Sequence, residues 1–274
     1  MGLMNRKDDY MTVLYLTATG NSMYIAKSLG GEAYSIPKMI KDEKYEFTDD
    51  KIGFVFPIYS NSVPPYISEF IKKSKFNSDY IFGVMTYGAY DGAAPNHLMD
   101  IGKQAGIEFA YINTIKMVDN WLPGFNMKKQ VENEHKKDIS THLAEIKADI
   151  DSAKSFILKT NCVDRKITAH WVKKSDKQTE KGSLHGYSTG RGIKDYINVQ
   201  DTCTQCGVCT KVCPVNNIRV DKEHGKISLG EHCISCFACT HNCPTNSIRM
   251  KGEKSTDRFR NSHVTLKDII AANS

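Results

Sequence analysis

Short apolar runs alternate with amphipathic stretches over the first 160 residues. The runs are rich in β-branched and aromatic residues, and such runs predict buried strands at 11–16, 52–56, 80–85 and 108–118. Helical spacing follows at 22–29, 64–73 and 95–105, and a long amphipathic segment at 131–159 closes the series. Strands that alternate with helices predict the α/β class, with a doubly wound parallel sheet covered by helices on both faces.

In such a sheet, ligands bind beyond the carboxyl ends of the strands, and the sequence has distinctive loops there. The loop after the first run reads TATGNS. Its hydroxyls, with backbone N–H groups at the start of a helix, predict a cradle for a phosphate. Neither the triphosphate loop GxxxxGK(S/T) nor the dinucleotide fingerprint GxGxxG is present. The residues expected in the cradle are Thr17, Thr19, Gly20, Asn21 and Ser22.

This loop resembles the phosphate loop of the flavodoxin-like family, and the likeness runs from residue 11 to about 159. In that family the loop holds the single phosphate of FMN. The resemblance therefore implies a flavodoxin-like, five-stranded parallel sheet and FMN as the cofactor.

The same resemblance places the isoalloxazine ring at the loops that follow the strands at 52–56 and 80–85. Their tyrosines could stack on the ring, or they could be ordinary, partly buried aromatics. The ring contacts expected are Pro57, Tyr59, Ser60 and Asn61 in the first loop, and Thr86, Tyr87, Gly88, Ala89, Tyr90 and Gly92 in the second. A third segment, 119–124, could cap the flavin.

Eight of the nine cysteines form two copies of the pattern C-x2-C-x2-C-x3-C-P, offset by thirty residues (233 − 203 = 30). This is the bacterial spacing for two [4Fe–4S] clusters, in which the fourth cysteine of each run ligates the other cluster. The first cluster is assigned to Cys203, Cys206, Cys209 and Cys243, and the second to Cys233, Cys236, Cys239 and Cys213. Residues 194–252 thus resemble a small α+β two-cluster ferredoxin, with a hairpin at 218–229, centred on His224 and Gly225, that joins the halves.

Zinc is the alternative metal, but zinc sites usually draw on two separated CxxC pairs. A disulfide framework is disfavoured because the patterned cysteines fall in one short segment with no secretory signal before them. Cys162 lies outside both motifs and is expected to be a structural thiol or to have no role.

Composition narrows the remaining possibilities. The chain has 274 residues, of which 40% are hydrophobic, and contains no apolar run long enough to span a membrane. Reduced thiols suit a cytoplasmic location. The net charge of +6 is spread along the chain with no nucleic-acid recognition motif, so nucleic acid is not expected as a partner. The densest basic stretch, 165–194, could steer an acidic redox partner or an anionic substrate, or could simply be a solvated connector.

The whole chain resembles the EFR1-type flavodoxin–ferredoxin fusion proteins of anaerobes. The resemblance implies a flavodoxin-like domain at 1–160, a basic connector at 161–193, the ferredoxin domain at 194–252 and a tail with a short helix at 253–274.

Two functions are compatible with this organisation. The first is an iron–sulfur flavoprotein oxidoreductase whose clusters feed FMN, which reduces a small substrate or a partner protein. The second is a pure electron carrier without a substrate. A homodimer could be needed to bring one chain's flavin beside another's cluster. No catalytic residue is assigned, although the general-acid candidates are Tyr59, Tyr90, Asp91, His97, His170 and His185.

Overall fold

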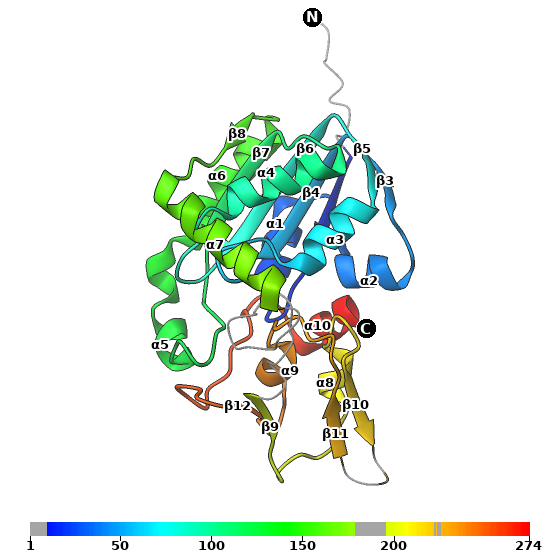
Figure 1. The fold of residues 1–274 in the computed structure, drawn as a ribbon, viewed down its shortest axis with the longest axis vertical. Helices are drawn as coiled ribbons and strands as arrows, with labels where there is room; N and C mark the ends of the chain where they lie inside the picture. The colour runs from blue at the N-terminus through cyan, green and yellow to red at the C-terminus, as the bar shows by residue number, and fades with distance from the viewer. Residues whose placement is uncertain (1–9, 179–195, 222, 224–225) are drawn as a thin grey trace, which may run out of the picture.

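The computed structural model describes residues 10–178, 196–221, 223 and 226–274 (Figure 1). Several sequence expectations fall outside these residues. They concern His185, most of the basic stretch, and His224 and Gly225 at the expected hairpin tip. Among the helices that the structure describes, none is both long and apolar enough to cross a membrane.

The first half is built on one sheet of six parallel strands in the order β2-β1-β4-β6-β7-β8. The strands are β1 (Met11–Tyr15), β2 (Glu32–Ser35), β4 (Lys51–Pro57), β6 (Tyr80–Tyr87), β7 (Tyr111–Lys116) and β8 (Phe156–Ile157). The first five follow the 2-1-3-4-5 order of the flavodoxin-like fold, in which the strand order reverses beside β1. Strands β3 (Glu46–Thr48) and β5 (Lys75–Asn77) form a separate parallel pair.

The sheet has one strand more than the five expected. The segment 131–159 was expected to be one amphipathic element, and this was wrong. It divides into the end of α5 (Met127–Glu132), η1 (Glu134–Lys137), α6 (Ile139–Asp151) and β8. Asp138 and Ala153 adopt left-handed backbone conformations, with φ of 47° and 51°, which end helical runs at both places.

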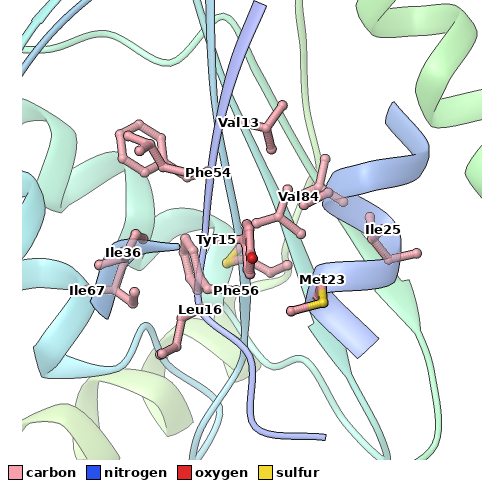
Figure 2. Close-up of a cluster of buried hydrophobic side chains, with 14 of the residues drawn as sticks. Val13, Tyr15, Leu16, Met23, Ile25, Ile36, Phe54, Phe56, Ile67 and Val84 are labelled. Atoms are coloured by element: carbon pink, nitrogen blue, oxygen red, sulfur yellow. The ribbon is translucent and has the colours of Figure 1, made fainter. Parts of the chain in front are cut away.

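Helices cover both faces of the sheet (Figure 1). Helix α1 (Asn21–Leu29) packs with α6 on one face, and α3 (Pro65–Lys73) packs with α4 (Ala94–Ala105) on the other. Residues Lys51 to Phe56 of β4 are all buried, as expected for a central parallel strand. Figure 2 shows the side chains of β1 and β4 meeting those of the surrounding helices, such as Ile25 and Ile67.

The second half is a duplicated unit. Each copy holds one short helix, α8 (Val208–Lys211) or α9 (Ala238–His241). Strands β10 (Ile218–Asp221) and β11 (Lys226–Leu229) form the expected hairpin, and β9 (Ile197–Val199) pairs with β12 (Ile248–Met250). The same left-handed positions recur thirty residues apart, at 205 and 235, 207 and 237, and 216 and 246. The duplication seen in the sequence is therefore also present in the backbone.

The two halves are joined by extensive contacts. Helix α7 (Cys162–Gln178) packs against α4, and α10 (Leu266–Asn273) lies between α2 (Ile36–Lys41) and α8 (Figure 1). The buried Asn273 amide donates to the carbonyls of Thr17 (3.1 Å) and Val212 (3.0 Å), one from each half. The carboxyl edge of the sheet is thus covered by the second half of the chain.

Candidate functional site: a phosphate loop and two sets of cysteines at one junction

The phosphate loop is a tight turn between β1 and α1. Gly20 has φ of 100° and precedes the helix, while its N–H donates to the Thr17 hydroxyl (3.0 Å). The Ser22 hydroxyl lies 2.9 Å from that of Thr86, at the end of β6. Thr17, Thr19 and Ser22 are each at most 3% exposed. The loop therefore brings hydroxyls and a helix N-terminus together in a buried place.

The carbonyls of this loop are tied to the second half of the chain. Those of Thr17 and Ala18 accept from the side chains of Asn273 and Asn242, and that of Thr19 accepts from the N–H of Asn261 (2.8 Å). The loop's own N–H groups are different. Within the described part of the chain, those of Thr19, Asn21 and Ser22 have no protein acceptor.

Buried N–H groups without an acceptor are rare, and a row of them forms the kind of nest that binds anions. With the carbonyls held from one side, the N–H groups remain available to a phosphate. The loop therefore fits the phosphate of FMN.

One hollow connects this loop with both expected ring loops. It has about 440 Å³ of empty space, its open mouth included. The expected residues that line it are Thr17, Thr19, Asn21, Ser22, Pro57, Tyr59, Thr86, Tyr87 and Gly88. Gly20, Ser60, Asn61, Ala89, Tyr90 and Gly92 do not line it. Asp119 and Asn120, from the segment expected to cap the flavin, also line it, as do Ala18, Ile58 and Val118, which were not chosen as contacts.

Asp119 shapes the second ring loop. Its carboxylate accepts from the N–H of Ala89 (3.1 Å) and of Trp121 (2.9 Å), and burial raises its pKa above the ordinary value. A side chain on Gly88 would collide with it, because a Cβ there would lie 2.1 Å from Asp119 Oδ2. The sequence signal for this segment was its position directly after a strand. The hydrogen bond between Ala89 and Asp119 joins residues thirty apart in the chain, and no local pattern predicts it.

The first ring loop is a rigid turn. Tyr59 and Ser62 exchange both backbone hydrogen bonds, and Ser60 and Asn61 between them have φ of 47° and 62°, as in a type I′ turn. The buried Thr168 of α7 donates to the Asn61 carbonyl (3.1 Å) and accepts from the Ala93 N–H (2.9 Å). The Thr168 hydroxyl thus ties the first ring loop, and the residue that follows the second, to α7. This attachment holds the turn that carries Tyr59.

Most general-acid candidates have other contacts. Tyr90 is exposed and donates to Asp164, whose carboxylate raises the pKa of the phenol to about 12. Asp91 accepts from Thr114 (2.9 Å), and His97 Nδ1 accepts from the Val63 N–H (3.2 Å). Of the candidates that the structure describes, Tyr59 alone lines the hollow.

The cysteines lie in two groups. Cys213, Cys233, Cys236 and Cys239 line one cavity together with apolar residues such as Ile218 and Leu229. Burial, followed by the thiols of Cys203, Cys206 and Cys243, raises the pKa of Cys209 to about 11. Each group thus contains three cysteines of one run and the fourth cysteine of the other.

Backbone donors also reach the sulfurs in a repeated manner. Asn217 N–H donates to Cys213 Sγ and Ser247 N–H to Cys243 Sγ, both at 3.2 Å and thirty residues apart. In the described residues, no three His, Cys, Asp or Glu side chains come close enough to hold a single metal ion.

The two sets of cysteines differ in their surroundings. Cys206 of the first set is exposed, whereas Cys236 of the second belongs to the same hydrophobic cluster as β1 and β4. His241 links the second run to the sheet edge. Its Nδ1 accepts from the Phe259 N–H (3.1 Å), so Nε2 carries the proton and donates to the Asn120 carbonyl (2.7 Å). Cys162 is exposed at the start of α7, outside both sets.

Comparison with known proteins matches residues 195–252 to the 4Fe-4S dicluster domain family. No curated protein matches the chain. Similar solved structures include a Trp repressor binding protein from Bacillus subtilis, at 12% identity over 56% of this chain and 99% of that one, with a TM-score of 0.33. Another is a flavoprotein in complex with FMN from Lactobacillus acidophilus NCFM, at 12% identity over 39% and 93% of the chains, with a TM-score of 0.29.

The fold of the first half is therefore assigned from its strand order. The second half is assigned from the family match and from its cysteines. The chain consists of an N-terminal flavodoxin-like domain fused to a C-terminal 4Fe–4S dicluster ferredoxin domain.

Proposed function

We propose that this chain is an iron–sulfur flavoprotein that transfers electrons between two [4Fe–4S] clusters and FMN. The first cluster would be held by Cys203, Cys206, Cys209 and Cys243, and the second by Cys213, Cys233, Cys236 and Cys239. When bound, the clusters supply single-electron exchange and the flavin supplies exchange of one or two electrons. The N–H groups of Thr19, Asn21 and Ser22 would bind the FMN phosphate.

The observation that carries this proposal is the bonding of the phosphate loop. Three successive loop carbonyls, from Thr17 to Thr19, accept hydrogen bonds from beyond the flavodoxin-like domain. The donor to Ala18 is Asn242 of the ferredoxin domain, and the donors to Thr17 and Thr19 are Asn273 and Asn261 of the C-terminal tail. The two cofactor regions therefore form one joined site. A ferredoxin that was merely tethered to the flavodoxin-like domain would have no reason to hold this loop.

An oxidoreductase is the leading form of this function, with a small substrate or a partner protein reduced in the cytoplasm of an anaerobe. It is supported by the wall that Val118, Asp119 and Asn120 add to the hollow. A pure carrier is the second form. It is supported by the exposed Cys206, where a partner protein could exchange electrons.

Anaerobic purification with iron, sulfide and released flavin measured together tests the proposal. Two four-iron clusters and one phosphate loop should give about eight iron and one FMN per chain. Iron without flavin would contradict the flavoprotein function. A screen of small oxidants against the reduced protein then separates the two forms, since a pure carrier would show no saturable turnover with any of them.

A further inference from the structure

We propose that the hydroxyl of Tyr59 donates a hydrogen bond to a sulfur of the second cluster, and so tunes that cluster from across the domain junction. The inference rests on the cluster part of the proposed function and is independent of whether FMN binds. Tyr59 would be a tuning residue, supplied by the flavodoxin-like domain to a cluster of the ferredoxin domain.

The first observation is a buried hydroxyl without a partner. The Tyr59 hydroxyl oxygen exposes less than 1 Å² to solvent and has no hydrogen-bond partner among the described residues. Leaving a buried hydroxyl unsatisfied costs about 1–3 kcal/mol. Such a group in a folded protein calls for an acceptor that belongs to a bound group.

The second observation is what surrounds this hydroxyl. Tyr59 packs against the hydrophobic core of the sheet, and this core extends to Ile234, Cys236 and Ala238, which line the cavity of the second set of cysteines. After burial, the thiols of Cys236 and Cys233 are the groups that raise the pKa of Tyr59. The sulfurs of the second cluster are therefore candidate acceptors for this hydroxyl.

A third observation comes from the same cavity. Ser235, between Cys233 and Cys236, lines it and also has a buried hydroxyl without a partner among the residues described. Two buried hydroxyls, one from each domain, thus lack an acceptor among the described residues: Ser235 lines the cavity of the four cysteines, and Tyr59 lines the hollow at the phosphate loop. Cluster sulfurs would satisfy both of them.

Tyr59 is held in a way that suits such a role. Its turn is closed by two backbone hydrogen bonds to Ser62, and Thr168 fixes the turn to α7. A hydrogen bond to a cluster sulfur stabilises the more negative, reduced cluster and raises its reduction potential. The exposed Cys206 belongs to the other set, so the effect should be confined to the second cluster.

The test is the reduction potential of each cluster in the Tyr59→Phe variant, measured by EPR-monitored titration of the holoprotein. The two signals are told apart with Cys213→Ala, which removes a ligand of the second cluster. Tyr87→Phe is the matched control, because Tyr87 lines the same hollow but has Asp91, not a cysteine, as its charged neighbour. ENDOR spectra in H2O and D2O report the exchangeable proton itself.

We expect Tyr59→Phe to shift the second cluster to a more negative potential and to remove one exchangeable proton coupling. The first cluster of this variant should keep its potential. In Tyr87→Phe, both clusters should keep their potentials. An unchanged second cluster overturns the inference, as does an equal shift of both clusters. A shift of the flavin potential alone also overturns it, since the hydroxyl would then face the flavin. Protein with eight iron and no flavin would contradict the flavoprotein proposal. The potential of the second cluster could still be measured in such protein, and it would still test the inference about Tyr59.

Discussion

Phe237 occupies a backbone position that suits glycine. The equivalent residue of the first repeat is Gly207, with φ of 74°, and Phe237 keeps that left-handed conformation with φ of 61°. A left-handed conformation costs a residue with a Cβ roughly 1–2 kcal/mol. The Phe237 ring is buried in a cluster with Val118 and Leu122 of the flavodoxin-like half, so packing across the junction offsets the strain.

The variant Phe237→Gly tests this balance. It should relieve the strain of about 1–2 kcal/mol but lose the 3–5 kcal/mol typical of deleting a buried phenylalanine, a net loss of about 2 kcal/mol. Gly207→Ala should lose about 1 kcal/mol from strain alone. Thermal unfolding of the anaerobic holoprotein measures both, and a Phe237→Gly protein more stable than wild type would show that strain outweighs packing.

Crossed ligation makes a second prediction at single residues. Cys213→Ala should damage the cluster held by Cys233, Cys236 and Cys239, because the cavity of those three thiols also contains Cys213. Cys243→Ala is the mirror-image control and should damage the first cluster. Mössbauer and EPR spectra distinguish the two, and loss of the cluster nearest in sequence to the substitution would refute the crossed arrangement.

The sequence predicts the elements that have strong local signals. Residues 52–56 form an uninterrupted apolar run and lie in the central strand β4. The edge strand β2, with the sequence EAYS, was missed because its residues are mostly only partly buried and form no apolar run. The short strands β3 and β5 were missed for a similar reason, since each alternates a single buried or half-buried phenylalanine with exposed residues.

In the candidate site, too, features with a local sequence signal were predicted and contacts between distant segments were not. Cysteine spacing and the TATGNS loop carry their chemistry in local patterns. Five residues of the loop line one hollow, and Cys213, Cys233, Cys236 and Cys239 line another cavity. The contacts of Asp119 with Ala89 and of Thr168 with Asn61 join segments distant in sequence. A single sequence holds no periodic or spacing signal for such pairs, because they depend on how the strands and α7 are placed.

Helix α10 gives a prediction at the scale of an element. Asn273, at its end and 1% exposed, donates to the phosphate-loop carbonyl of Thr17, and Asn273→Ala would leave that buried carbonyl without its donor. FMN affinity should fall about tenfold, equivalent to about 1.4 kcal/mol. The exposed Asn133, whose amide donates within its own helix end, is the matched control.

Fluorescence titration of the apo-flavin protein with FMN measures both variants, with iron content as a check on the clusters. Equal affinity in Asn273→Ala and wild type would contradict a role for α10 in holding the loop.

At the scale of the whole molecule, the junction bears on the expectation that a dimer could be needed for electron transfer. The concern was that flavin and clusters on one chain could be too far apart. Cys236 and Tyr59 instead pack in one hydrophobic cluster, and Asn242 from the second run donates to the Ala18 carbonyl (3.1 Å). We therefore propose that electrons pass between the clusters and the flavin of one chain.

Electron transfer between the clusters and the flavin should accordingly be an intramolecular, first-order process. After flash photoreduction, its rate constant should stay the same over a tenfold range of protein concentration, with light scattering to establish the oligomeric state. A rate that rises with concentration would instead point to exchange between chains.

The bonding of the phosphate loop to Asn242, Asn261 and Asn273 also has a consequence for biosynthesis. Domains generally fold as units, the N-terminal one first, while the chain is still being translated. The residues that cover this loop follow it by more than two hundred positions, so the flavodoxin-like half leaves the ribosome with the loop uncovered. Nascent protein therefore passes through a stage at which the anion cradle is open to the solvent. That stage ends only when the cysteine-containing second half has folded and its asparagines cover the loop.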